Sequence, residues 1–377
     1  MKKCGIKATI TLRLLFLMHT MYLTGAAAQV DDFRVLGIHS GWLMVSSRLY
    51  VTIDEGVHWT DITPPIKRDQ KIGPVFFLDE KHGWVAICVN HSPEDDETVV
   101  ISVARTNDGG KSWREQSISP KEYEGGRQFP NPSQIQFIDE KTGWMNVSLA
   151  YKATMNTCTG ILLRTTDGGR IWKQIGYDSC GRMHFIDREQ GWMENHIGDI
   201  ALLRTHDGGN KWSKISLPDW GKCKNCWESW IDTPYFADQK NGAVMVGLVD
   251  NSENSLNHQY SLIYATNDQG DSWQIADVTE LGNDISTNTM LPFKRDQPFK
   301  SVVCNSTNCY VHTTSSQDQS IVPPFSMPPH RTSISALDDA HWWARFKFKI
   351  EDHLFSTTDG GKSFHEIPLP TKLAVNQ

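Results

Sequence analysis

The chain has 377 residues and a formal net charge of −7, from 37 basic and 44 acidic residues. This acidic balance, with no basic run of five or more residues, argues against binding to nucleic acid or to an anionic membrane surface. After the first thirty residues no apolar run is long enough to cross a membrane, so we expect a protein that does not span one.

The N-terminus has the pattern of a secretory signal peptide. It begins Met1-Lys2-Lys3, continues through a short apolar stretch, and ends in the small residues Ala26-Ala27-Ala28. This order predicts residues 1–28 as a signal peptide and cleavage before Gln29. The mature chain, residues 29–377, then has a charge near −11, because four basic residues leave with the signal. We therefore expect an exported protein, periplasmic or secreted.

A short phrase occurs six times in the remaining chain: Thr, any residue, Asp, any residue, Gly, two residues, then an aromatic. One copy runs from Thr106 to Trp113. Thr and Asp side chains can bond backbone groups within a tight turn, and Gly allows conformations that a side chain forbids. We interpret the phrase as a hairpin turn and its Asp as structural. The six residues are Asp54, Asp108, Asp167, Asp207, Asp268 and Asp359.

A second phrase precedes most copies of the first: Phe, any residue, Asp, three residues, then Gly-Trp. Its clearest copies end at Gly83-Trp84, Gly143-Trp144 and Gly191-Trp192. Two hairpins per unit make four antiparallel strands, which is a propeller blade. Six marked units, and a degenerate one at about residues 285–330 that has lost its Asp turn, predict an all-β, seven-bladed propeller.

The blade topology predicts where function lies. The two repeated turns of each blade should lie on one face, and the loops of variable length on the other. Functional residues are usually carried by variable loops on a rigid scaffold. The variable loops are residues 90–98, 117–133, 150–160, 217–232, 250–260 and 277–299.

Seven cysteines remain after the signal. In an oxidising compartment they favour disulfides. Cys304 and Cys309 flank one predicted turn, Cys158 and Cys180 fall in neighbouring loops, and Cys223 and Cys226 form a lone CxxC. A zinc site would need a second nearby pair and a redox site a thioredoxin-like context, so we expect a local disulfide and no metal. Cys88, in a predicted strand, is expected to be a buried free thiol.

The Thr-x-Asp-x-Gly-x-x-Trp turn resembles the Asp-box, or bacterial neuraminidase repeat. This turn is found in sialidases, xyloglucan-degrading hydrolases, sortilin-like receptors and the photosystem II assembly and stability factor family. With the added Phe-x-Asp-x-x-x-Gly-Trp hairpin, the chain is most similar to the last family. That resemblance covers nearly the whole mature chain. It implies a single exported seven-bladed propeller.

Two classes of function fit this resemblance. The first is a non-catalytic propeller that binds a protein or glycan on the variable-loop face, as an assembly or stability factor for an envelope or membrane complex. A photosystem assembly factor is expected to present a positive surface, so the acidic mature chain favours a relative with a different exported client. This reading needs no cofactor, and we expect a monomer.

The second class is a glycoside hydrolase acting on extracellular glycans, sialidase-like or xyloglucanase-like. Such an enzyme needs paired carboxylates, or a Tyr nucleophile with an acid and an arginine triad. The sialidase Arg-Ile-Pro signature is missing, and xyloglucan-degrading enzymes typically use two propellers. Arg105, Arg164 and Arg204 resemble a triad, but each precedes a turn Thr and is interpreted as structural. The loop with Glu122, Tyr123, Glu124 and Arg127 holds the alternative catalytic candidates.

Candidate binding residues come from two places. Trp220, Trp227 and Trp230 lie in the link before the fifth blade, where exposed rings could stack on sugars or anchor a protein; packing between blades is the other interpretation. The second set is expected on inner strands near the ring axis, as binding groups or as ordinary polar lining. These residues are Arg182, His184 and Asp232.

Overall fold

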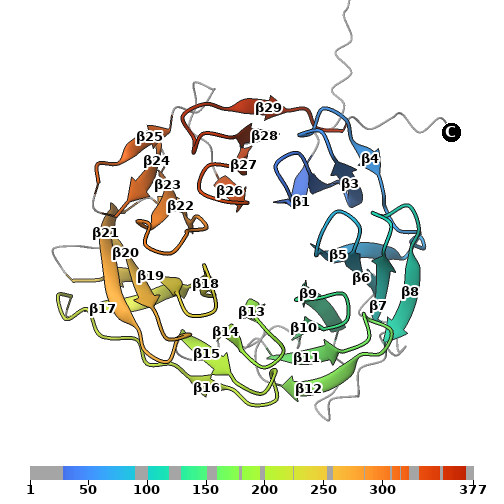
Figure 1. Ribbon diagram of the computed structural model, residues 1–377, viewed down its shortest axis with the longest axis horizontal. Coiled ribbons are helices and arrows are strands. Elements are labelled where there is room, and N and C mark those ends of the chain that lie inside the picture. The colour runs from blue at the N-terminus through green and yellow to red at the C-terminus, as the bar shows by residue number, and fades with distance from the viewer. Residues whose placement is uncertain are drawn as a thin grey trace, which may run out of the picture.

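The computed structural model is a ring of seven antiparallel sheets, as the repeats predict (Figure 1). It describes residues 29–89, 101–118, 129–150, 159–177, 181–195, 200–223, 225–252, 258–283, 285–305, 308–314, 316–321, 331–348 and 351–370. The predicted signal peptide, the catalytic candidates Glu122, Tyr123, Glu124 and Arg127, and the cysteines Cys158 and Cys180 lie outside these residues.

Each blade is built from consecutive strands that pair in chain order. Blade 1 contains β1 (Val30–Val35), β2 (Gly41–Val45), β3 (Arg48–Thr52) and β4 (Thr60–Asp61). Blade 2 contains β5 (Gln70–Phe77), β6 (Gly83–Val89), β7 (Ile101–Thr106) and β8 (Arg114–Ile118). Blade 3 contains β9 (Phe129–Phe137), β10 (Gly143–Ala150), β11 (Thr159–Thr165) and β12 (Lys173–Tyr177). Blade 4 contains β13 (Met183–Phe185), β14 (Gly191–Asn195), β15 (Ala201–Thr205) and β16 (Ser213–Lys214).

The fifth blade has its first strand in two parts, because β17 and β18 both pair with β19. Its strands are β17 (Cys226–Ile231), β18 (Tyr235–Phe236), β19 (Gly242–Asp250), β20 (His258–Thr266) and β21 (Gln274–Gly282). Blade 6 contains β22 (Ile285–Met290), β23 (Lys300–Asn305), β24 (Cys309–Thr313) and β25 (Gln319–Ile321). Blade 7 contains β26 (Arg331–Ala336), β27 (Trp342–Lys347), β28 (Asp352–Thr357) and β29 (His365–Ile367). The degenerate unit thus forms a four-stranded sheet without the Asp turn.

The Gly-Trp phrase joins neighbouring blades. Trp144, fully buried at the start of β10, stacks on Phe185 of the next blade with ring centroids 3.8 Å apart. Trp84 stacks on Phe137 in the same way, at 3.6 Å. The glycine of the phrase leaves room for the ring, since a Cβ on Gly143 would lie 2.6 Å from Phe137. The phrase therefore encodes the contact between blades as well as the turn within one.

Each Thr-x-Asp turn is closed by its own side chains. In the third blade Thr165 Oγ1 donates to Asp167 Oδ1 at 2.9 Å, and Gly169 N–H donates to Thr165 Oγ1 at 3.0 Å. The same carboxylate oxygen accepts from the backbone N–H groups of Arg170 and Ile171. These hydrogen bonds use the Asp carboxylate inside the turn that carries it.

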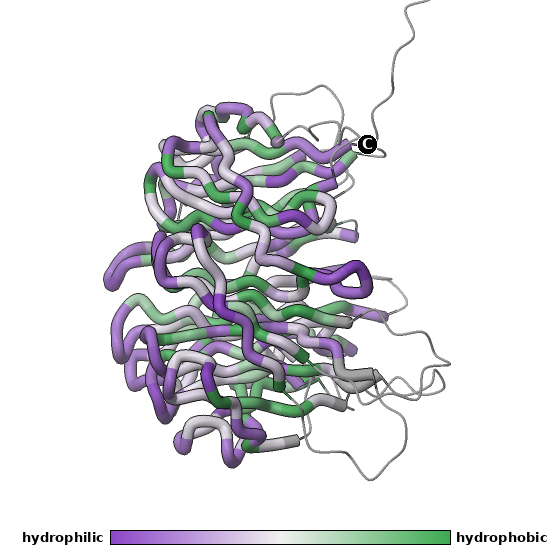
Figure 2. The backbone as a smooth tube through the Cα atoms, turned by 90° about the vertical axis from the view of Figure 1, so that its right-hand side faces the viewer, coloured by the Kyte–Doolittle hydropathy of each residue, from purple (hydrophilic) through white to green (hydrophobic). Residues whose placement is uncertain are grey.

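The short turns gather on one face, which we call the turn face; it is the hydrophilic edge at the left of Figure 2. The opposite face, where inner strands begin and second strands end, is called the loop face. None of the described segments forms a helix with the length and apolar character that a membrane span requires.

The ring closes between blades 7 and 1 through side chains. A Cβ on Gly41 would lie 2.4 Å from the ring of Trp343, so the last blade packs directly on the first. The backbone N–H of Val35 donates to Ser335 Oγ at 3.1 Å, and that of Val30 donates to Asp352 Oδ2 at 2.8 Å. In the described sheets no strand is exchanged between the first and last blades.

Candidate functional site

The predicted residues Arg182 and Asp232 meet between blades 4 and 5. Arg182 precedes β13, and Asp232 lies between β17 and β18. Arg182 Nη2 is 2.6 Å from Asp232 Oδ1, and Arg182 Nε is 2.9 Å from Glu194 Oε1 on β14. The Glu194 side chain is 3% exposed, whereas that of Arg182 is 65% exposed. One guanidinium thus holds two carboxylates and still reaches solvent.

Inner strands of blades 1 and 4 bring further charges together near the ring axis. Asp32 and Arg34 of β1, Arg182, His184 and Glu194 of blade 4, and Asp232 of blade 5 are called the axial cluster. Burial lowers the pKa of His184 to about 4, and the charge of Arg34 lowers it further in the same direction. His184 is therefore neutral at pH 7, and Arg34 influences it although the two residues belong to blades 1 and 4.

Burial also raises the pKa values of the cluster's aspartates. The Asp32 side chain is exposed to solvent, but the neighbouring inner strands reduce the hydration of its carboxylate. This desolvation raises the pKa of Asp32. Desolvation raises the pKa of Asp232 as well, with repulsion from Glu194, while Arg182 opposes the shift. Desolvation lowers the pKa of Arg34. Each of these shifts favours the neutral form of the group.

The three tryptophans have different environments. Sequence reasoning placed all three in a link, but Trp227 and Trp230 lie on β17. The difference arises because the first strand of blade 5 starts before the Tyr235-Phe236 phrase and is interrupted at residues 232–234. Trp230 packs over Gly247, where a Cβ would lie 2.0 Å from its indole nitrogen.

Of these tryptophans, Trp227 is the exposed one. Trp220 packs against Tyr260, with ring centroids 5.0 Å apart. Trp227 is 51% exposed on β17, near the loop face. The described residues include five other exposed large hydrophobic side chains, and all five lie in turns of the turn face. They come from blades 1, 3 and 7 and are Ile38, Ile53, Val57, Ile171 and Leu337.

Two predicted disulfides are present. Cys223 bonds to Cys226, and Cys304 bonds to Cys309. Cys88 is a buried free cysteine, as expected, and burial raises the pKa of its thiol. The remaining cysteine pair lies outside the described residues.

The arginines that precede the turns contact neighbouring blades. The Arg204 guanidinium is buried, lies over Trp192, and binds Asp271 at 2.6 Å. At the equivalent place beside Arg105, the next blade carries Arg170 instead of an acid. Burial first, and then repulsion by Arg170 and Arg114, lower the pKa of Arg105. Arg105, Arg114 and Arg170 line a hollow of about 460 Å³ on the turn face. The hollow is locally basic, which the overall negative charge of the chain did not predict.

The fold is shared with solved propellers. YCF48 bound to a D1 peptide has a TM-score of 0.53 and 14% identity, covering 89% of this chain and 90% of that one. YCF48 from Cyanidioschyzon merolae has a TM-score of 0.51 and 16% identity, covering 82% and 88%. An ancestral GH74 enzyme has a TM-score of 0.51 and 13% identity over 89% of this chain, which spans 44% of the enzyme.

No family model matches the chain, and no curated protein sequence does. The likeness to YCF48 confirms, at the level of the fold, the similarity to the photosystem II assembly and stability factor family that the repeats predict. At these identities the likeness is one of fold, and the seven blades are those of the sheets described above.

Proposed function

We propose that this protein is an exported, non-catalytic propeller that binds an extended segment of a protein partner near the loop face. The observation that carries the proposal is Trp227, a half-exposed indole on the first strand of blade 5. Exposed tryptophans are enriched among the residues that dominate binding energies, because a rigid ring buries a large area at low entropic cost.

Strand β17 connects Trp227 to the axial cluster. Five residue steps separate Trp227 from Asp232, a span of roughly 16 Å along a strand. Asp232 and Glu194 contact the Nη2 and Nε sides of the Arg182 guanidinium. Because arginine has five N–H donors, its Nη1 group can still donate to a peptide carbonyl or carboxylate. An extended segment could therefore use an aromatic contact at one end and a charged contact at the other.

A protein partner is favoured over a glycan by the comparison with YCF48, a propeller of the same fold that has been solved with a peptide bound. The proposed client is an envelope or membrane complex whose assembly or stability the propeller assists. Export follows from the predicted signal peptide, whose residues lie outside the described structure.

The purified protein can be tested against a displayed library of random peptides and, in parallel, an array of glycans. We expect selected peptides, and we expect Trp227→Ala to weaken their binding by about 2 kcal/mol, as for other aromatic anchors. Ile171→Ala is the matched control, because Ile171 is similarly exposed, at 62%, but lies on the turn face. It should bind the same peptides normally.

The other outcomes are distinct. Peptides that bind both variants equally would remove Trp227 from the site, and hits only on the glycan array would replace a protein partner by a carbohydrate. Release of product from sialyl or xyloglucan substrates, lost in Glu122→Gln or Tyr123→Phe, would establish the hydrolase instead.

A further inference from the structure

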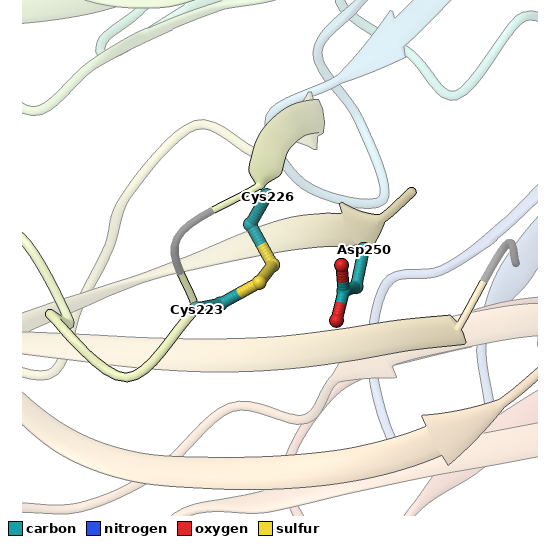
Figure 3. A group of neighbouring side chains, drawn as sticks. All are labelled: Cys223, Cys226 and Asp250. Atoms are coloured by element: carbon teal, nitrogen blue, oxygen red, sulfur yellow. A yellow bond between two sulfur atoms is a disulfide. The ribbon is translucent and has the colours of Figure 1, made fainter. Parts of the chain in front are cut away.

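Three metal-binding side chains lie together where β17 begins. Cys223 and Cys226 form a disulfide, and Asp250 is the register partner of Cys226 on β19. Figure 3 shows the Asp250 carboxylate beside the two sulfurs. The ligand atoms of the three residues lie within 4.8 Å of one another, and all three residues are half-buried. It is the one such group of three within the described residues.

The redox state decides what these residues can bind. The thiolate is the form of cysteine that binds a metal ion, and a closed disulfide has none. A dithiol reductant transfers two electrons and two protons to the disulfide. The S–S bond breaks, two thiols form, and the reductant becomes a disulfide. The two sulfurs can then separate enough to hold an ion between them, beside an oxygen ligand that is already in place.

We propose that the reduced Cys223–Cys226 pair and Asp250 form a site for a thiophilic divalent cation such as Zn²⁺. Binding forms two Zn–S bonds and one Zn–O bond and releases the two thiol protons to solvent. Cys-x-x-Cys is the ligand spacing of many zinc sites, and carboxylate oxygen is also a zinc ligand. A metal is not expected from the sequence, because no second cysteine pair is near. The register between β17 and β19 supplies a carboxylate instead.

The surrounding hydrogen bonds suit this role. Asp250 Oδ1 accepts from the backbone N–H of Ser252 at 2.8 Å, which orients the carboxylate and leaves Oδ2 for a cation. His258 is the register partner of Asp250 on β20, but it does not belong to the group of ligand atoms that lie within 4.8 Å of one another. Water is therefore expected to complete the coordination of the cation.

The test uses the full chain with its disulfides intact or reduced by a phosphine, desalted without oxygen and titrated with Co²⁺ and then Zn²⁺. We expect the reduced protein to bind about one equivalent of Co²⁺ with a thiolate-to-cobalt charge-transfer band, as a site with two thiolates should. Zn²⁺ should abolish the band by displacement. The oxidised protein should show no band.

Variants assign the ligands. The double variant Cys223→Ser/Cys226→Ser should lose the band, and Asp250→Asn should weaken Co²⁺ binding at least tenfold. The matched control is Cys304→Ser/Cys309→Ser, which removes the other disulfide and should retain the band. Near-ultraviolet circular dichroism verifies that each variant is folded.

Reduced wild-type protein with no more Co²⁺ binding than its oxidised form would overturn the proposal without any variant. Unchanged binding in Asp250→Asn would remove the carboxylate from the site. A band that disappears only in Cys304→Ser/Cys309→Ser would move the thiolate ligands to the other pair.

Discussion

Aspartates on the turn face and in the axial cluster differ in the direction of their pKa shifts. In the turns, hydrogen bonds from Ser112 and Thr106 lower the pKa of Asp108 to about 2, although the residue is only partly buried. Near the ring axis, desolvation raises the pKa of Asp232 despite a salt bridge of 2.6 Å to Arg182. The same side chain is thus held strongly ionised at the surface and pushed towards neutrality in the centre.

The difference shows which carboxylates are committed to the fold. A turn carboxylate accepts hydrogen bonds from between two groups, at Asp207, and four groups, at Asp359, of its own turn, which uses much of its capacity to bind a ligand. In the axial cluster, Glu194 and Asp232 are both held by the single guanidinium of Arg182. Perturbed groups of the second kind are those that functional sites use. The repeated aspartates are the more visible in the sequence, and the axial charges are the better functional candidates.

The largest effect is expected from Arg182→Met. This change removes the guanidinium that both Glu194 and Asp232 contact, and Glu194 is almost fully buried. Removing one partner of such a buried group costs about 3 kcal/mol of unfolding free energy. The midpoint of urea unfolding at pH 7 measures it.

Neutralising the carboxylates as well, by Glu194→Gln and Asp232→Asn, should restore most of that stability. Arg170→Met, on the turn face, is the control and should change stability by less than about 0.5 kcal/mol. Equal losses in the two arginine variants would show that the axial position is not special.

A smaller loss, about 2 kcal/mol, is expected for Asp167→Ala. Three hydrogen bonds within the turn disappear, and each contributes about 0.5–1.5 kcal/mol at most. The melting temperature should fall while peptide binding at the loop face stays normal. Wild-type melting with lost binding would reverse the roles that we give to the two regions.

The smallest effect is the pH dependence of the turns. Hydrogen bonds from Ser363, first its hydroxyl and then its backbone N–H, lower the pKa of Asp359 to about 2, against about 3.9 in an unfolded chain. A lowered carboxyl pKa contributes stability above about pH 4, and that contribution is lost as the pH falls towards 2. The unfolding free energy should therefore decline steeply in this window.

Asp359→Asn should reduce the number of protons taken up on unfolding between pH 4 and 2, by up to about one. The slope of unfolding free energy against pH gives that number. The aspartates of the axial cluster shift in the opposite direction, so Asp232→Asn should not flatten the acid slope. A variant pair with the opposite result would show that the axial carboxylates, and not the turns, determine acid stability.

The fold could be predicted because the repeated phrases specify local geometry. Thr165, Asp167 and Gly169 make their contacts within five residues, so the sequence alone displays them. The Gly-Trp phrase recurs for the same reason, although its role in stacking Trp144 on Phe185 of the next blade required the structure. Blade 6 was inferred from its length, and its sheet is present from Ile285 to Ile321.

The candidate site was less predictable because it depends on register and on contacts across the ring. The residues between Cys226 and Asp232 read as a link, since the Phe-x-Asp phrase of blade 5 starts later, and only pairing with β19 reveals a strand. The same pairing brings Asp250 to the Cys223–Cys226 disulfide. Glu194, the second carboxylate that Arg182 contacts, belongs to no recognisable motif and was not predicted from the sequence.

The closure of the ring by side chains has a consequence for folding. Phe33, Leu43 and Val45 of the first blade share a core cluster with Trp343 and Leu354 of the last. During synthesis these first apolar side chains must wait for nearly the whole chain to be made, since their partners come last. The first blade is therefore the one exposed longest to wrong partners, and transiently exposed strands of this kind are prone to aggregate. A protein built this way gains from anything that delays or shields its folding until residue 370 is available.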